Sequence, residues 1–303
     1  MNVCVIGAGA MGSLFGAMLA EAGLKVTLFD IRQDHVDAIN AKGLCVEKEA
    51  SIRRVQVPAT TDVSRIGPAD LCLVFVKSTQ TEDASKTASR LAGPSGLVLT
   101  LQNGMGNADT LSSRLGPSRV IAGTTSHGAT FLQPGTIRHA GSGDTVVGPW
   151  DEKGRVGAKR VCDLFNHAGI KTLVKDDVRG VLWSKLFINV GINAITALTG
   201  IQNGQLLDLE QTRQLCREAV REAAAVARKL NVHITEDPVK NVFGVAKATG
   251  DNRSSMGQDV DNRRLTEIAA INGYVVKMAK QAGIPVPINR TLTSLVETLQ
   301  SHY

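Results

Sequence analysis

The feature that most restricts the fold of this chain is its opening run, MNVCVIGAGAMG. A short apolar segment typical of a buried strand leads into a GxGxxG and then into a segment with helical periodicity. In such a unit Gly7 allows the tight turn, Gly9 leaves room for a pyrophosphate, and Gly12 lets helix and strand pack closely. Ala10 and Met11 lie at the positive end of the helix, where free N–H groups attract phosphate. The run predicts a Rossmann-type domain that binds a dinucleotide.

The rest of the chain continues this organisation and then changes. Its 303 residues exceed the usual size of one hydrophobic core, so we expect two domains. Up to about residue 174, short apolar runs alternate with amphipathic segments, which predicts a doubly wound parallel sheet, with short strands and turns over 119–148. The expected strands are 3–6, 25–30, 70–77 and 96–101, and the expected helices between them are 11–22, 34–42 and 81–91. A mostly helical second domain, 175–303, is expected to hold helices over 178–198, 209–230, 239–248, 255–282 and 290–300.

Composition restricts the class of protein. Five scattered cysteines without a CxxC pair suit a reducing compartment and argue against a zinc site, so no metal is expected. The net charge of +6 suits anionic small ligands, whereas dispersed basic residues and 4% aromatics do not indicate nucleic acid. The start of the chain does not resemble a secretion signal, and no long uncharged apolar run predicts a membrane span. We therefore expect a cytoplasmic enzyme.

The end of the second predicted strand bears on the choice of cofactor. Asp30 can bond both ribose hydroxyls and would repel a ribose phosphate, which favours NAD. Arg32, two residues later, can instead pair with the phosphate of NADP. The alternative for Asp30 is an exposed turn residue, because Asp is common where strands end. The residues alone leave these possibilities open.

Two more polar residues follow predicted strands. Lys77 ends the run LCLVFV, and Asn103 follows VLTLQ. Parallel sheets bind ligands beyond the carboxyl ends of their strands, so both residues are candidates for a site on the same edge as the glycine turn. Each could instead be a solvated strand terminus, because loops after strands are usually polar.

The predicted helix 178–198 carries the most informative side chains of the second domain. Lys185, Asn189 and Asn193 are spaced by four and share one face with Thr196, whereas the rest of the circumference is apolar. Desolvation of Lys185 disfavours its charged form and makes it a candidate general acid. A lysine that packs its stem along apolar surface, with amides that satisfy neighbouring backbone groups, is the alternative.

A second polar cluster runs from Asn252 to Glu267. Ser254 or Ser255 can cap a helix, and Glu267 precedes the apolar run IAAI, where its carboxylate can orient a substrate and balance a lysine charge. Asp259 and Arg263 are spaced as an intrahelical ion pair. His127 and His139 have no neighbours that suggest a catalytic triad, and we interpret them as structural or surface residues.

The segments GAGAMG, LQNGMGN, WSKLFINVGINAITAL, NRSSMGQDV and RRLTEIAAINGYV together resemble the ketopantoate reductase family over nearly the whole chain. The resemblance implies reduction of 2-dehydropantoate to pantoate with NADPH, on the route to pantothenate and coenzyme A. It implies that Lys185 is the general acid and that Glu267 orients the substrate and lies by the cofactor. It places Asn189, Asn193, Asn252 and Ser255 on the substrate, and Lys77 and Asn103 by the nicotinamide and substrate.

The chain departs from this family after the second strand. The family commonly has Arg directly after an uncharged residue, where this chain has Asp30-Ile31. The cofactor is therefore NADP by resemblance, whereas Asp30 favours NAD. Two alternatives follow: an NAD-dependent 2-hydroxyacid dehydrogenase of the same fold that acts on another branched 2-oxo acid, and a non-catalytic dinucleotide sensor, which would be expected to lack Lys185 or Glu267. A homodimer is compatible with the sequence.

Overall fold

The computed structural model describes all residues, 1–303, and separates into two compact units. The first unit comprises Met1–Gln102 and Asn107–Val178, and the second comprises Asn103–Gly106 and Arg179–Tyr303. The division differs from the expected boundary after residue 174 in two respects. It falls four residues later, and a short loop from the first half of the sequence groups with the second unit. Each unit is described by itself.

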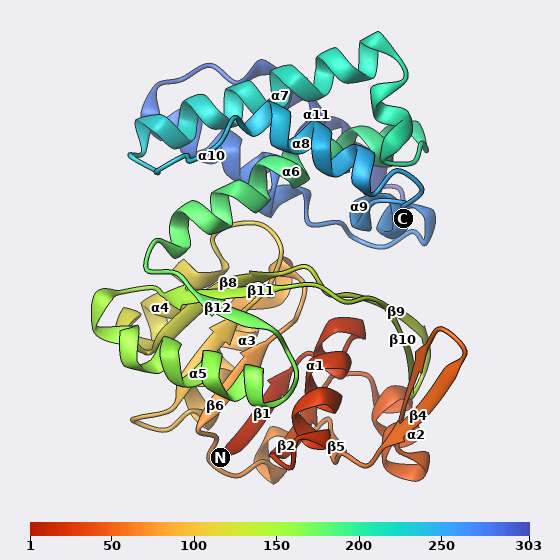
Figure 1. The fold of residues 1–303 in the computed structure, drawn as a ribbon, viewed down its shortest axis with the longest axis vertical. Coiled ribbons are helices and arrows are strands. Elements are labelled where there is room, and N and C mark those ends of the chain that lie inside the picture. Colours follow the sequence, from red (N-terminus) through yellow and green to blue (C-terminus); the bar gives the residue numbers. More distant parts are fainter. The chain divides into compact units, whose positions relative to one another are not determined.

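The first unit contains an eight-stranded, mainly parallel sheet (Figure 1), in the order β12-β11-β8-β7-β6-β1-β2-β5. Its strands are β1 (Asn2–Ile6), β2 (Lys25–Phe29), β5 (Ala59–Thr60), β6 (Leu71–Val74), β7 (Leu97–Thr100), β8 (Val120–Thr125), β11 (Thr145–Pro149) and β12 (Thr172–Val174). Within this large sheet, β8 and β11 are the only neighbouring strands that pair antiparallel. Strand β1 lies between β2 and β6 in parallel register, as expected for a doubly wound fold.

A smaller sheet of the first unit has the order β4-β3-β10-β9. Its strands are β3 (Leu44–Lys48), β4 (Ser51–Val55), β9 (Gly128–Gln133) and β10 (Thr136–Gly141). Strands β8 to β11 confirm the expectation of short strands over 119–148. His127 and His139 lie here with their rings 3.3 Å apart, measured from Nδ1 to Nε2.

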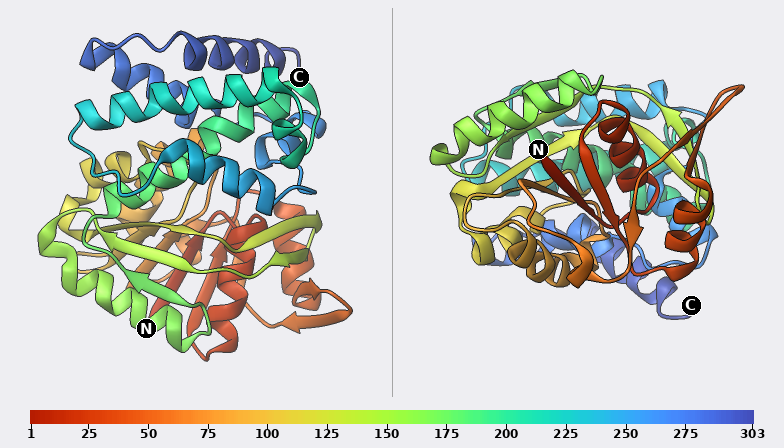
Figure 2. Two further views of the ribbon diagram at one scale, coloured as in Figure 1. Left: turned by 45° about the horizontal axis from the view of Figure 1, so that its top comes forward. Right: turned by 90° about the horizontal axis from the view of Figure 1, so that it is seen from below.

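Helices cover both faces of the large sheet. They are α1 (Ala10–Glu21), α2 (Gln33–Lys42), α3 (Thr81–Leu91), α4 (Asn107–Leu115) and α5 (Arg155–His167). Figure 2 shows α1 and α5 on one side of the sheet and α3 and α4 on the other. Phe15 of α1 and Phe165 of α5 are fully buried, with ring centroids 5.6 Å apart. They belong to the core that fixes α1, and with it the glycine turn, on the sheet.

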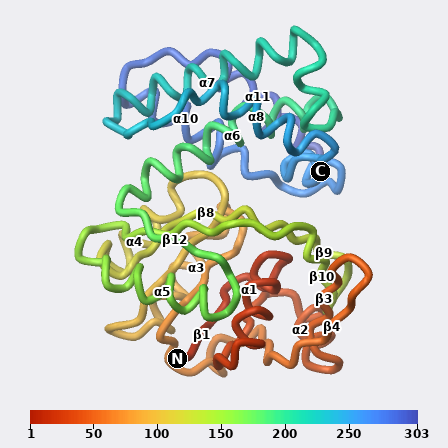
Figure 3. The backbone as a smooth tube through the Cα atoms, in the orientation of Figure 1, coloured from red at the N-terminus to blue at the C-terminus, as the bar shows by residue number.

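The second unit is helical, and the backbone enters it along α6 (Figure 3). Its helices are α6 (Val178–Thr199), α7 (Glu210–Lys229), α8 (Pro238–Ala248), α9 (Ser255–Asp261), α10 (Asn272–Ala282) and α11 (Pro287–Gln300). A Cβ on Gly191 of α6 would lie 2.8 Å from both Val220 of α7 and Val242 of α8, so this glycine allows close helix packing.

By length and composition α6 could span a membrane, although 61% of its most apolar window is buried inside the protein. It is the core helix of the second unit, in contact with α7, α8 and α10. The mixed α/β fold with a helical second part agrees with the predicted fold class.

The expected helix over 255–282 was wrong. Helix α9 ends at Asp261, a short 3₁₀ turn, η6, covers Ile268–Ala270, and α10 begins at Asn272. Arg263 has φ +50°, in the left-handed region, so it cannot continue the helix. The interpretation of Asp259 and Arg263 as a pair on one helix was therefore wrong as well. The ion pair in this region joins Arg253 to Asp261.

Candidate active site

The glycine turn between β1 and α1 has the shape that its sequence predicts. Gly7 has φ +92°, and a Cβ there would lie 2.8 Å from the backbone nitrogen of Val76. A Cβ on Gly12 would lie 2.0 Å from the carbonyl oxygen of Gly7, so the helix could not approach with a larger residue. A Cβ on Gly9, in contrast, meets nothing within 4 Å, and no side chain caps the helix here. The turn leaves open space at the positive end of α1.

A buried histidine that the sequence analysis did not select holds this turn. The ring of His35 is fully buried, and its Nε2 lies 2.8 Å from the carbonyl oxygen of Ala8. Its Nδ1 accepts a hydrogen bond of 2.9 Å from the backbone N–H of Gly135, in the turn between β9 and β10. Because one nitrogen accepts, the ring is neutral here and Nε2 donates to Ala8. Burial lowers the pKa of His35, which favours the same state.

Asp30 and Arg32 form one polar turn after β2. Oδ1 of Asp30 accepts a 3.0 Å hydrogen bond from the backbone N–H of Arg32. The guanidinium of Arg32 pairs with Asp34 at 2.9 Å and lies over the ring of Phe131, 4.5 Å from its centroid. The hydrogen bond from Arg32 lowers the pKa of Asp34. The cation of Arg32 therefore already has an acidic neighbour inside the protein.

Lys77 and Asn103 follow β6 and β7, as predicted, but their surroundings differ. Lys77 is exposed in the first unit. Asn103 begins the loop that groups with the second unit, and the next residue but one, Met105, donates its backbone N–H to Ala270 at 2.8 Å. Gly104 has φ +76°, and a Cβ there would lie 2.6 Å from the Ala270 carbonyl oxygen. The loop is therefore pressed against η6, directly after Glu267.

Helix α6 carries Lys185, Asn189 and Asn193 as expected. Burial lowers the pKa of Lys185 to about 8, and the nearby carboxylate of Glu267 opposes this by raising it. Glu267 is 7% exposed and precedes η6. The structure thus brings together the two residues that the sequence suggested as acid and orienting carboxylate.

Asn189, one turn further along α6, has a buried Nδ2 with no hydrogen-bond partner. A buried amide nitrogen without a partner destabilises the folded protein, because it has lost its hydrogen bonds to water and has gained none within the protein. An oxygen of a bound molecule would satisfy it. This orphaned donor lies one helical turn from Lys185, on the same face.

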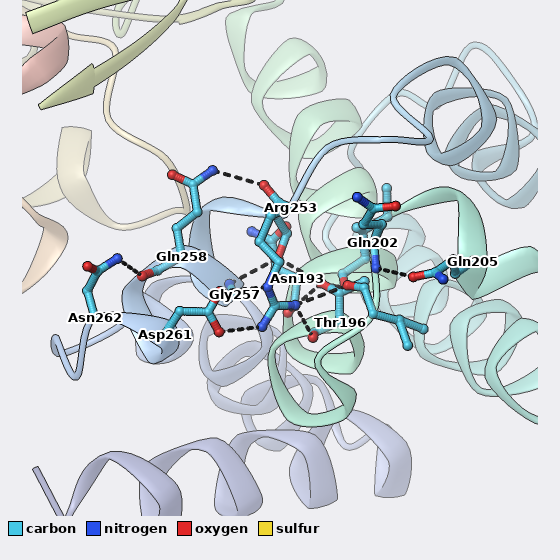
Figure 4. Close-up of polar contacts among 12 residues, drawn as sticks. Asn193, Thr196, Gln202, Gln205, Arg253, Gly257, Gln258, Asp261 and Asn262 are labelled. Atoms are coloured by element: carbon cyan, nitrogen blue, oxygen red, sulfur yellow. Dashed lines mark hydrogen bonds and ion pairs between the residues drawn. The ribbon is translucent and has the colours of Figure 1, made fainter. Parts of the chain in front are cut away.

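The segment from Asn252 to Ser255 is fastened to the end of α6 (Figure 4). Ser254 caps α9, since its Oγ accepts the backbone N–H of Gly257 at 3.0 Å. The same Oγ lies 2.7 Å from the Thr196 hydroxyl. Asn193 reaches Oγ of Ser255 at 3.5 Å. The side chains of Asn252 and Ser255 remain exposed beside this buried cluster.

Comparison with known proteins decides the family. The family model "Ketopantoate reductase PanE/ApbA" matches residues 3–152, and "Ketopantoate reductase PanE/ApbA C terminal" matches residues 177–300. The chain belongs to the ketopantoate reductase family. The two matches cover both the unit with the glycine turn and the unit with Lys185 and Glu267.

Relatives in this family align end to end. The chain is 37% identical over 301 residues to the 2-dehydropantoate 2-reductase of Halobacterium salinarum, covering 99% of each protein. It is 33% identical to that of Pyrococcus horikoshii, over 99% of this chain and 98% of the relative.

Two solved structures illustrate the range of the fold. A PanE/ApbA family ketopantoate reductase from Ralstonia eutropha superposes with a TM-score of 0.92 at 37% identity, covering 100% of this chain and 99% of the other. A D-mandelate dehydrogenase in a ternary complex with NADH and anilino(oxo)acetate superposes with a TM-score of 0.93 at 26% identity, with the same coverage. Within this fold, therefore, solved relatives carry names that refer to different substrates, one a 2-oxo acid and the other a 2-hydroxy acid.

Proposed function

We propose that this member of the family is a 2-dehydropantoate 2-reductase, which transfers hydride from a nicotinamide cofactor to the 2-oxo group of ketopantoate and forms pantoate for pantothenate and coenzyme A synthesis. The observation that carries the proposal is the pairing of Lys185, with its pKa lowered to about 8, with the buried Glu267. A lysine in that range can supply a proton near neutral pH. A non-catalytic dinucleotide sensor would not need this pair.

The cofactor suits the residues of the first unit. The open space beside Gly9 and the uncapped start of α1 would accept a pyrophosphate, held by the turn from Gly7 to Gly12, including Ala10 and Met11. Asp30 and Arg32 would meet the adenosine ribose. Lys77, Asn103 and Glu267 are proposed to lie by the nicotinamide. When bound, the nicotinamide supplies the hydride.

Lys185 acts on the oxygen of the substrate carbonyl. At neutral pH its ammonium donates a proton from Nζ to this oxygen as negative charge develops there, and it becomes a neutral amine. Partial burial makes this loss of charge easier than in water, and Glu267 keeps most Lys185 groups protonated below pH 8. Solvent then restores the proton to Nζ.

The substrate is held by amides and a hydroxyl. Asn189 would donate its orphaned Nδ2 to a substrate oxygen, which turns a destabilising group into a specific contact. Asn193, Asn252 and Ser255 are proposed to bind the remaining hydroxyl and carboxylate oxygens. Asn193 and Ser255 are already within 3.5 Å of one another.

The choice between NADH and NADPH rests on the turn after β2. A 2′-phosphate would face the carboxylate of Asp30 and would compete with Asp34 for Arg32. We therefore propose that NADH is used at least as well as NADPH. This arrangement also supports the second candidate function, an NAD-dependent 2-hydroxyacid dehydrogenase, since the D-mandelate dehydrogenase of the same fold was solved with NADH.

Steady-state oxidation of NADPH and NADH with a panel of branched and aromatic 2-oxo acids tests both functions. The highest kcat/KM with ketopantoate is expected. A clear preference for another 2-oxo acid would replace the first candidate with the second, and no turnover of any acid, together with tight cofactor binding, would support a sensor. The cytoplasmic location and the homodimer stay expectations, to be checked by cell fractionation and analytical ultracentrifugation.

A further inference from the structure

Arg253 stands in the sequence between Asn252 and Ser255, which are proposed to bind the substrate. Its guanidinium, however, bonds to other groups of the second unit (Figure 4). Nε and Nη2 donate to the two carboxylate oxygens of Asp261, at 2.8 and 2.9 Å. Nη1 donates to the carbonyl oxygens of Thr196 and Ile201, at and just beyond the end of α6. A guanidinium has five N–H groups, so four of them are committed to partners within the second unit.

The guanidinium of Arg253 is packed against the backbone of α9. A Cβ on Gly257 would lie 2.6 Å from its Cζ, so the guanidinium packs directly on the first turn of α9. Its own carbonyl oxygen accepts a 2.9 Å hydrogen bond from Gln258. The Arg253 side chain is 19% exposed, whereas that of Asp261 is 51% exposed. Arg253 therefore joins both ends of α9 to the carboxyl end of α6.

The residues on either side of Arg253 depend on this link. The carbonyl oxygen of Asn252 accepts the backbone N–H of Asn203 at 3.0 Å. Ser254 completes a chain of hydrogen bonds that runs from the backbone N–H of Gly257 through its own hydroxyl to Thr196. Within residues 252–255, only the side chains of Asn252 and Ser255 are exposed. The hydrogen bonds of Arg253 to Asp261, Thr196 and Ile201, called the Arg253 clamp below, hold the backbone between them in place.

We propose that Arg253 is a positioning residue that sets the 252–255 segment for the substrate, and that it does not bind the substrate carboxylate itself. The proposal rests on the proposed function for its kinetic consequence. Its structural consequence, the order of the 252–257 backbone, holds whatever the substrate is. Losing a group that only positions binding residues raises KM more than it lowers kcat.

The experiment compares Arg253→Met, Arg253→Lys and Asp261→Asn in the full chain. For Arg253→Met we expect KM for ketopantoate to rise about tenfold or more through misplacement of Asn252 and Ser255, with kcat within about threefold and cofactor Kd unchanged. Hydrogen exchange of the Asn203 and Gly257 amides should become faster in the same variant. Asp261→Asn should change both readouts in the same direction, because it removes the charged acceptor of Nε and Nη2.

Lysine cannot reproduce the forked donors of a guanidinium, so KM in Arg253→Lys should rise nearly as much as in Arg253→Met. The combined Arg253→Met/Asp261→Asn variant should be no worse than Arg253→Met, because both changes break one clamp. Arg221→Met is the matched control, since it removes the same charge from an exposed pair with Glu218 on α7. It should change neither readout.

Direct binding of the substrate carboxylate would give another pattern. KM would rise in Arg253→Met without faster amide exchange, and Asp261→Asn would leave KM unchanged or lower it by freeing the guanidinium. Either result would overturn the proposal. If ketopantoate is not reduced at all, the proposed function fails, and the exchange rates of Asn203 and Gly257 alone still decide whether Arg253 orders the segment.

Discussion

Replacing Lys185 by Met should separate the stability of the second unit from its chemistry. Lys185 is buried enough for its pKa to fall from 10.5 to about 8, despite the attraction of Glu267. Since each pKa unit is worth about 1.4 kcal/mol, holding the charged form costs the folded protein about 3 kcal/mol relative to the neutral form.

The sign follows from proton binding. Below pH 8 both folded and unfolded chains hold the proton, and the cost is present in full. Between pH 8 and 10.5 the unfolded chain holds more protons than the folded one, so the free energy of unfolding rises with pH. Wild type should therefore gain about 3 kcal/mol in free energy of unfolding relative to Lys185→Met across this window.

The assay is urea unfolding at several pH values, followed by tryptophan fluorescence. The chain has two tryptophans, Trp150 in the first unit and Trp183 in the second. In a Trp150→Phe background the signal comes from Trp183, two residues from Lys185 and buried in the core of its unit. Lys277→Met, an exposed lysine on α10, controls for loss of one positive charge.

The same variant tests the chemistry. Loss of the acid should lower kcat by about two to four orders of magnitude at pH 7, while cofactor binding survives. Wild-type kcat/KM should fall as pH rises above about 8, where Lys185 loses its proton. A stability difference that stays flat from pH 7 to 10.5 would refute the argument from burial, and near-native turnover of Lys185→Met would end its assignment as the acid.

Three further changes test other parts of the site. Asp30→Gly should raise the ratio of kcat/KM for NADPH over NADH, and Asp34→Asn should raise it too by releasing Arg32; a wild type that already prefers NADPH strongly would contradict this reasoning. Because burial lowers the pKa of His35 below its ordinary value of 6.5, the folded ring stays neutral above pH 6.5 and takes up a proton only at lower pH, where its bond to Gly135 is lost. Cofactor Kd should therefore be flat from pH 7.5 to 6.5 and rise only at more acidic pH in wild type, and less in His35→Gln; identical acid profiles by titration calorimetry would exclude this role. Asn189→Leu removes the buried Nδ2 that has no partner, so it should raise KM for the 2-oxo acid and leave the melting temperature unchanged or higher. A markedly lower melting temperature would show that the amide has a structural partner.

Local sequence patterns were sufficient where local interactions decide the structure. The predicted helix 81–91 coincides with α3, and GAGAMG forms the turn that its glycines require. The spacing of Lys185, Asn189 and Asn193 on α6 follows from helical periodicity alone. For the same reason the family could be recognised from short segments.

Long-range contacts explain what the sequence did not reveal. His35 is bonded to Gly135, 100 residues away, and nothing near it in the sequence indicates that partner. The segment 263–270 has helical periodicity, yet Thr266 bonds to Gln300 and Ala270 to Met105 instead of continuing a helix. Tertiary partners override local propensity in both places.

The loop from Asn103 to Gly106 has a consequence for protein engineering. Met105, 6% exposed, belongs to the hydrophobic core of the second unit although it precedes that unit's helices by more than 70 residues of sequence. A fragment that starts at α6 would therefore lack a core side chain and the partner of the Ala270 carbonyl. Chimeras between relatives should exchange residues 103–106 together with the helical half, because a single crossover near residue 178 would pair this loop with a foreign core.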